Sequence, residues 1–377
     1  MNKDVAVILE RFHRAANDPG AYARSWKMKT EKDVIGFFCS YTPEEIILAA
    51  GALPFRLFGS QRRISLADAH LQAYSCSLVR GALEDALSGD LDFLTGTVFA
   101  HTCDSIMRLS DIWRMNMGFD FHIDVVLPVK LNTKTAREYM IDVIRKFKRD
   151  LERETKTDIS HEQIRSSVHT MNRIRELLGE LYDMKSQQPV ILSGTDFNAI
   201  FKGSMIMDRH DVRDMLEELL GILRDLDMKT LAGGKRILLA GGLCNLPDIF
   251  EMIESSGGFI VSDDFCSGSR YADGQVRIQE DIVAAIADRY AERVVCPAKH
   301  AALYSRGEHV LRLAREQGVD GVIFLYLKFC DPHAFDYPYM KRMLDHENIP
   351  SMLFEMEDQL PSEGQFKTRC EAFIEML

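Results

Sequence analysis

Several short motifs that define common enzyme classes are missing from this sequence. It has no Gly-x-x-x-x-Gly-Lys-Ser/Thr loop, which excludes ATP hydrolysis through a phosphate-binding loop of that type. It also lacks the Gly-x-Gly-x-x-Gly fingerprint of dinucleotide sites and the Gly-x-Ser-x-Gly elbow of serine hydrolases. No Cys-x-x-Cys pair is present, although zinc sites commonly use such close pairs.

Basic charge and long apolar runs are also scarce. The 377 residues contain 46 Lys and Arg against 57 Asp and Glu, a formal net charge of −11. Such a chain is a poor general binder of nucleic acid, because phosphate contacts need clustered lysines and arginines. The apolar run at residues 322–327 is too short to span a bilayer, and residues 1–16 resemble a charged amphipathic helix, not a signal peptide. We therefore expect a cytoplasmic protein with no nucleic-acid and no membrane partner.

The cysteines are the most informative feature that is present. The chain has 8 of them, and a cytoplasmic location predicts free thiols or metal ligands. Cys76, Cys103 and Cys330 stand where a strand should end or a helix should begin. Ligands of open α/β sheets bind at the carboxyl ends of strands, so thiolates gathered there could hold an iron–sulfur cluster. Packing as a small apolar residue is the alternative for any single cysteine.

The hydrophobic pattern predicts an α/β fold with two similar doubly wound lobes joined by a helical segment. Strands are expected near residues 33–38, 53–58, 95–100, 123–127, 235–240, 258–261, 321–327 and 351–355. Helices are expected near residues 42–50, 76–87, 104–116, 133–185 (two, with a turn at 158–162), 193 onward and 208–227. The predicted domains are residues 1–131, 132–230 and 231–377, an α/β lobe on either side of a mainly helical connection.

Local signals give further candidates. Thr42 is expected to cap the helix that begins at Pro43, and Asp331 to cap the helix after Cys330. His333 could act as an acid or base, or support a cluster ligand. His101 lies two residues before Cys103, a spacing on a loop that tends to separate the two side chains instead of forming a nucleophile–base pair. His101, His333 and Asp331 are thus candidates for catalysis without an assigned role.

Five segments carry a resemblance to a known family. They are residues 41–54 (YTPEEIILAAGALP), 76–78 (CSL), 101–105 (HTCDS), 328–338 (KFCDPHAFDYP) and 368–377 (TRCEAFIEML). Together they resemble the iron–sulfur subunits of the benzoyl-CoA reductase and 2-hydroxyacyl-CoA dehydratase family, above all the smaller, C-type subunit of class I benzoyl-CoA reductase. The resemblance implies flavodoxin-like lobes and a [4Fe-4S] cluster held by Cys76, Cys103 and Cys330. The other cysteines match no ligand position of the family.

The resemblance also implies partners and a reaction. Family members pair with a larger homologous iron–sulfur subunit and receive electrons from an ATP-hydrolysing activator. Residues 111–114 and 267–271 resemble the reductases, which implies ATP-dependent reduction of benzoyl-CoA, an aromatic acyl-CoA, to a cyclic dienoyl-CoA. One alternative is a subunit of an (R)-2-hydroxyacyl-CoA dehydratase, which forms an enoyl-CoA through a ketyl radical. Two others are a homodimeric reductase with a double-cubane cluster and a non-enzymatic cluster-binding scaffold. The acyl group, the stoichiometry and the fourth iron ligand stay open.

Overall fold

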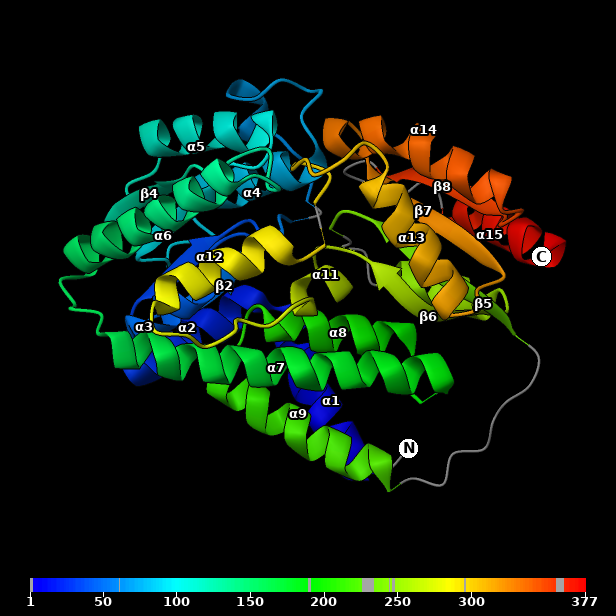
Figure 1. Cartoon of the computed structure of the whole chain (residues 1–377), viewed down its shortest axis with the longest axis horizontal. Helices are drawn as coiled ribbons and strands as arrows, with labels where there is room; N and C mark the ends of the chain where they lie inside the picture. Colours follow the sequence, from blue (N-terminus) through cyan, green and yellow to red (C-terminus); the bar gives the residue numbers. More distant parts are fainter. Residues whose placement is uncertain are drawn as a thin grey trace.

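The computed structural model describes residues 3–60, 62–188, 191–225, 234–243, 245, 248–294, 296–356 and 363–377. It contains two parallel four-stranded sheets, one in each lobe (Figure 1). The N-terminal lobe holds β1 (Val34–Phe37), β2 (Leu53–Arg56), β3 (Gly96–Ala100) and β4 (Phe121–Val125). The C-terminal lobe holds β5 (Lys235–Gly241), β6 (Gly258–Asp264), β7 (Gly321–Leu327) and β8 (Ser351–Met356).

The two sheets share one topology. Their strand orders are β2-β1-β3-β4 and β6-β5-β7-β8. In each sheet the first strand in the sequence therefore lies between the second and the third, and the fourth lies at the edge beside the third. All neighbouring strands pair in parallel. This is the strand order of flavodoxin-like folds, in which ligands bind outside the carboxyl ends of the strands. The predicted α/β class, the eight strands and the likeness of the two lobes are confirmed.

The helices cover the sheets and connect the lobes. In the N-terminal part they are α1 (Lys3–Asn17), α2 (Pro19–Thr30), α3 (Glu44–Ala49), α4 (Ser77–Leu87) and α5 (Asp104–Asn116), with a short 3₁₀ turn, η1 (Ala67–Ala69). The central helices are α6 (Lys134–Thr155), α7 (His161–Gln187), α8 (Gly194–Ser204) and α9 (Arg209–Arg224). The C-terminal part holds α10 (Asp248–Ser255), α11 (Ser269–Ala272), α12 (Ile282–Glu292), α13 (Ser305–Glu316), α14 (Asp331–His346) and α15 (Glu363–Met376). Within the described ranges, no helix has the length and apolarity needed to cross a membrane.

The start of α3 differs from the sequence-based prediction. Thr42 does not cap the helix, because Pro43 occupies the cap position, with φ −71° and ψ 80°, and no side chain caps the first turn. The ψ angle of 80° takes Pro43 out of the helical region, so the first helical residue is Glu44. Thr42 is buried, and its carbonyl accepts a hydrogen bond from the Tyr290 hydroxyl at 2.7 Å.

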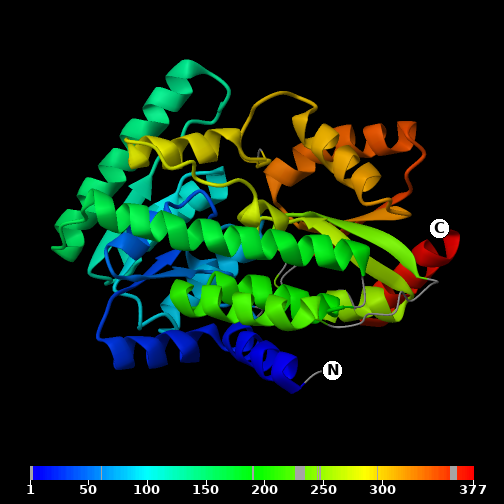
Figure 2. The same ribbon diagram turned by 60° about the horizontal axis from the view of Figure 1, so that its bottom comes forward.

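The long helix α7 joins the two lobes. It begins at the predicted turn with a capping box, in which Ser160 and Gln163 satisfy each other's backbone N–H groups. The helix packs against α3 of the N-terminal lobe and against β6 and α11 of the C-terminal lobe, and it extends beneath both lobes (Figure 2). α12 returns to pack against α6, so the chain crosses between the lobes again after β6. The predicted domain boundaries at 131 and 230 stay a prediction.

Buried ion pairs reinforce this junction. Arg209 on α9 donates to Glu44 on α3 at 2.7 Å, and Arg175 on α7 pairs with the neighbouring Glu45. Tyr271 on α11 adds a longer hydrogen bond to Glu44 at 3.3 Å. All these side chains are buried, so the loss of either member of a pair would leave an uncompensated charge at the junction.

Candidate functional site

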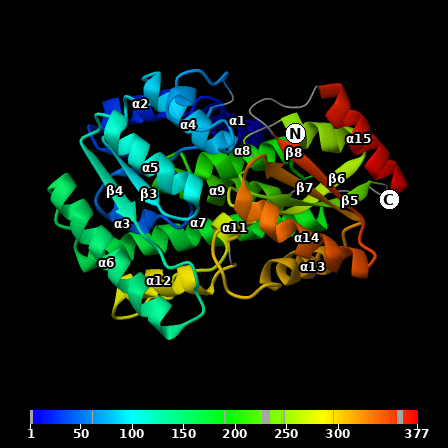
Figure 3. The same cartoon turned by 90° about the horizontal axis from the view of Figure 1, so that it is seen from above.

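A cavity of about 110 Å³ lies between the lobes and is lined by residues from both. α5 of the N-terminal lobe and α14 of the C-terminal lobe face each other across this interface (Figure 3). We call the cavity the cysteine chamber, because six thiols line it: Cys39, Cys76, Cys103, Cys266, Cys296 and Cys330. All six are free thiols in the described structure. The structure therefore brings Cys76, Cys103 and Cys330 together at one cavity, and their role as ligands stays a prediction.

These three predicted cysteines share one local geometry. Each is the residue immediately before a helix: Cys76 before α4, Cys103 before α5 and Cys330 before α14. Burial raises the pKa of all three thiols, that of Cys103 to about 12. In each case a hydrogen bond from the backbone N–H three residues further on lowers the pKa of the thiol. These N–H groups belong to Val79, Ile106 and His333. A helix N-terminus stabilises an anion, so the three sulfurs are placed where thiolates gain most from the backbone.

Sequence reasoning missed the second set of three thiols. Cys39 follows β1 and Cys266 follows β6, whereas Cys296 lies in the loop after α12. The rule that identified the first set, a cysteine just beyond a strand, also applies to Cys39 and Cys266. Of the remaining cysteines, Cys370 lies on α15 and is buried in the core of the C-terminal lobe, and it does not line the chamber. Cys244 lies outside the described residues.

The chamber is electropositive. Among the described residues that line it, Arg56, Arg270 and Arg293 are cationic and none is Asp or Glu. Arg56 donates through Nη2 to the sulfur of Cys266 at 3.3 Å and through Nη1 to the carbonyl of that residue at 3.2 Å. A soft, thiol-rich and cationic lining suits a negatively charged, thiolate-bound group.

The candidate catalytic residues fall in three different places. His333 lines the chamber, and burial lowers its pKa well below the usual value, so the ring is neutral. Its Nδ1 has no hydrogen-bond partner in the described part of the chain. Asp331 is exposed and does not line the chamber. Its predicted capping role is wrong, because Cys330 occupies the cap position and Asp331 is the first residue of the helix.

His101 belongs to a separate network on β4. Its Nε2 lies 2.8 Å from Asp124 Oδ1, and Ser110 and His122 contact the same oxygen. Burial raises the pKa of Asp124, but hydrogen bonds from His122, Ser110 and His101 outweigh it and hold the pKa well below its usual range. The His101 ring does not line the chamber that Cys103 lines, as the two-residue spacing predicted.

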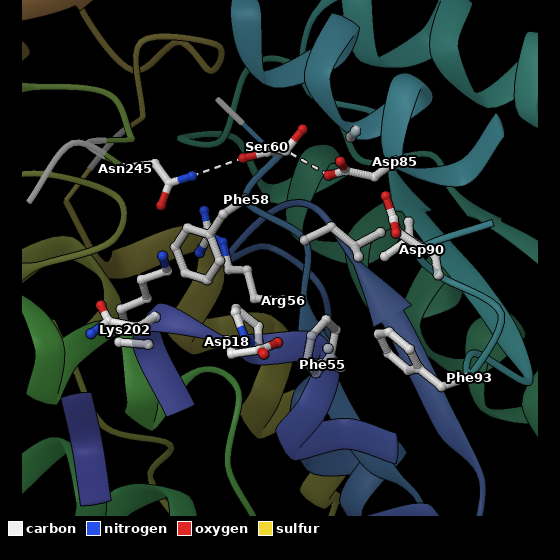
Figure 4. Close-up of a pocket in the computed structure, with 18 of the residues that line it drawn as sticks. Asp18, Phe55, Arg56, Phe58, Ser60, Asp85, Asp90, Phe93, Lys202 and Asn245 are labelled. Carbon is white, nitrogen blue, oxygen red and sulfur yellow. Dashed lines mark hydrogen bonds between the residues drawn. The ribbon is translucent and has the colours of Figure 1, made fainter. Parts of the chain in front are cut away.

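A larger pocket adjoins the chamber. It has a volume of about 490 Å³ and lies beside the carboxyl end of β2, between α4 and the junction of α1 and α2 (Figure 4). We call it the β2 pocket. Arg56 is the one described residue that lines both cavities, so its side chain forms part of the wall between them. Asn245 and Ser60 line the β2 pocket, and each has a buried oxygen that finds no hydrogen-bond partner among the residues that the structure describes.

The donor set distinguishes between kinds of metal site. Among the described residues, no group of three or more His, Cys, Asp or Glu is arranged around a single metal ion. A [4Fe-4S] cluster attaches each cysteine to a different iron, so its ligands are more widely spaced than those of one ion. Six thiols around one cavity, with arginines and without carboxylates, therefore fit an iron–sulfur cluster better than a mononuclear site.

Comparison with known proteins identifies the family of the chain. Residues 39–377 match the family model of the 2-hydroxyglutaryl-CoA dehydratase D-component, so the chain belongs to that family. It is 27% identical over 366 residues to the (R)-phenyllactyl-CoA dehydratase beta subunit of Clostridium sporogenes, covering 97% of both chains. It is 25% identical over 339 residues to the C-type subunit of the benzoyl-CoA reductase of Thauera aromatica, covering 88% of both. It is 24% identical over 381 residues to the (R)-2-hydroxyglutaryl-CoA dehydratase beta subunit of Acidaminococcus fermentans, covering 99% of this chain. The family prediction is confirmed, and these relatives are subunits of enzymes.

Proposed function

We propose that this chain is the iron–sulfur component of a low-potential enzyme that acts on acyl-CoA thioesters. One observation carries the proposal: Cys76, Cys103 and Cys330, from three distant segments and both lobes, line the same chamber. These three thiolates would hold a [4Fe-4S] cluster, which supplies one-electron chemistry at low potential when bound. The scaffold alternative would leave the neighbouring β2 pocket, whose 490 Å³ lies within the range of small-molecule sites, without a role.

The reaction is a finer proposal. Reduction of benzoyl-CoA to a cyclic dienoyl-CoA is supported by the resemblance of residues 267–271 to the reductases, and Arg270 in that segment lines the chamber. The other segment that resembles the reductases contributes nothing at the chamber, because Trp113 packs in the core and Arg114 pairs with Asp111 on the surface. Two of the relatives are beta subunits of dehydratases that act on 2-hydroxyacyl-CoA thioesters. Formation of an enoyl-CoA from an (R)-2-hydroxyacyl-CoA is therefore the competing proposal.

A specific observation favours a second candidate, the double-cubane reductase. A single [4Fe-4S] cluster takes at most four cysteine ligands, whereas six line the chamber. Cys39, Cys266 and Cys296 would then hold a second cubane joined to the first. Such a protein would work as a homodimer and would not need the larger homologous subunit.

The partners follow from the same reasoning. No phosphate-binding loop of the Walker type occurs in the sequence, so the ATP that drives low-potential electron transfer must be hydrolysed by a separate activator. In the first candidate a larger homologous iron–sulfur subunit binds beside this chain and carries the acyl-CoA chemistry. The proposed location is the cytoplasm, where the thiols stay reduced.

The test is purification without oxygen from the native host, followed by identification of bound subunits. Co-purification of an unlike, homologous subunit supports the first candidate, and a homodimer supports the second. The complex is then supplied with activator and with either benzoyl-CoA or a 2-hydroxyacyl-CoA. Ring reduction consumes ATP in proportion to product, whereas dehydration is redox-neutral and needs ATP only to start turnover. A protein without iron and without either reaction would refute the proposed function.

A further inference from the structure

The arginines of the chamber have donors that the protein itself does not satisfy. Nε of Arg56, Nε and Nη1 of Arg270, and Nε of Arg293 are buried without a hydrogen-bond partner among the described residues. The exposed fractions of these side chains are 1%, 3% and 7%. Buried cationic donors without acceptors are costly, so three arginines with such donors around one cavity indicate that its occupant is an anion.

The scaffold holds Arg270 and Arg293 in place. Arg270 donates through Nη2 to the carbonyl of Gly241, and its Nε lies 3.5 Å from the carboxylate of Asp264, an ion-pair contact without a hydrogen bond. Arg293 donates to the carbonyl of Ser40 at 3.1 Å and lies 4.1 Å from the centre of the Tyr41 ring. These contacts fix both guanidinium groups, and they also give both residues a structural role.

Arg56 differs from the other two. Its hydrogen bonds go to the carbonyl and sulfur of Cys266 and, at 3.7 Å, to the sulfur of Met205. Its guanidinium also lies 5.9 Å from the Phe58 ring (Figure 4). No Asp or Glu pairs with Arg56 in the described part of the chain, so its buried charge has no protein counter-ion. The nearest group that can become anionic is the thiol of Cys266.

We propose that Arg56 sets the reduction potential of the cluster in the cysteine chamber, and this inference rests on the proposed cluster. Reduction adds one electron from the external donor to the cluster and neither forms nor breaks a bond. A buried cation and an N–H···S hydrogen bond stabilise the more negative, reduced state, which raises the potential. Arg56 is thus a positioning residue and not a ligand. Its buried charge acts on the cluster of either candidate, and its hydrogen bond to the Cys266 sulfur acts in addition if Cys266 is a ligand, as in the double-cubane candidate.

The test compares Arg56→Lys and Arg56→Met in the cluster-loaded protein. Each variant is titrated with a low-potential reductant, and the reduced cluster is followed by electron paramagnetic resonance. We expect Arg56→Met to be reduced at a clearly more negative potential than the wild type, with unchanged iron per chain. Arg56→Lys keeps the charge but loses the paired hydrogen bonds from Nη1 and Nη2 to Cys266. Its potential should therefore lie between those of the wild type and Arg56→Met.

The matched control is Arg24→Met. Arg24 also lines the β2 pocket, but it pairs with Asp92 at 2.9 Å and does not line the chamber, so its replacement should leave the potential unchanged. A wild-type potential in Arg56→Met with full iron content would overturn the inference. If that variant does not assemble its cluster, wild-type potentials in both Arg56→Lys and Arg293→Gln would overturn it. Absence of iron from the wild-type protein would refute the proposed function instead, so the two failures are distinguishable.

Discussion

Cys103 and Cys330 occupy equivalent positions in the two lobes. Cys103 lies between β3 and α5, and Cys330 between β7 and α14, so each follows the third strand of its own sheet and precedes a helix. Both sheets have the same strand order, and the lobes are placed so that these two helix starts line one chamber. A cofactor bound there would be held by both halves of the molecule at once.

The second set of thiols gives the first prediction. The double-cubane candidate predicts about eight irons per chain in the wild type and the loss of about half of them in Cys266→Ser, because it assigns Cys266 to the second of two cubanes. Metal analysis of anaerobically purified protein distinguishes this from the single-cluster candidate, which predicts no loss in Cys266→Ser. About four irons in both proteins would favour a single [4Fe-4S] cluster on Cys76, Cys103 and Cys330.

The buried ion pair between Glu44 and Arg209 gives the second prediction. Glu44→Gln leaves the Arg209 guanidinium, which is fully buried, without its counter-charge, and should cost about 3 to 5 kcal/mol of unfolding free energy. Urea denaturation measures the loss. The control is Glu180→Gln, which removes the partly exposed pair with Arg224 and should cost at most about 1 kcal/mol. Equal costs would show that the α3–α9 contact does not depend on this pair.

The third prediction concerns pH and the segment that leads to Cys76. Glu84 on α4 accepts hydrogen bonds from the backbone N–H groups of Ser65 at 3.0 Å and Ala67 at 2.9 Å. Burial raises its pKa, but these bonds outweigh burial and lower the pKa from 4.5 to about 2. Because the folded-state pKa is depressed, the stabilisation is complete above pH 4.5 and is lost as the pH falls towards 2.

The measurement for Glu84 is the difference in unfolding midpoint between wild type and Glu84→Gln. We expect the wild type to be more stable at pH 7 and the difference to shrink steadily below about pH 4.5. Both chains experience the same acid, so the difference isolates the carboxylate. A difference that stays constant from pH 7 to pH 3 would contradict the depressed pKa.

Much of the fold could be predicted because it depends on local patterns. Apolar runs placed all eight strands, and Ser160, Ser193 and Asp208 cap the helices that follow them. The rule that ligands bind at the carboxyl ends of strands pointed to Cys103 and Cys330. Their gathering with Cys76 depends on how the two lobes face each other, because β3 and β7 belong to different sheets.

The errors also have physical reasons. At Thr42 and Asp331 the expected cap lies one residue away from the true cap, which is Pro43 in the first helix and Cys330 in the second. The backbone ψ angles of these two residues, 80° and 84°, place the helix start directly after them. Cys296 and Arg293 reach the chamber only because the chain crosses between the lobes around α12. That crossing depends on tertiary packing and has no local signal. Cys39 and Cys266 did carry the strand-end signal, but the family resemblance gave them no role.

The most direct test of the central claim compares iron content in two serine variants. Cys330 lines the chamber at the start of α14 and is a proposed ligand. Cys370 lies on α15, is buried in the core and is not a proposed ligand. After purification without oxygen, we expect the wild type and Cys370→Ser to be brown and to hold at least about four irons per chain. Cys330→Ser should lose most of that iron. Equal iron in both variants, or a colourless wild type, would contradict the assignment of the chamber as the cluster site.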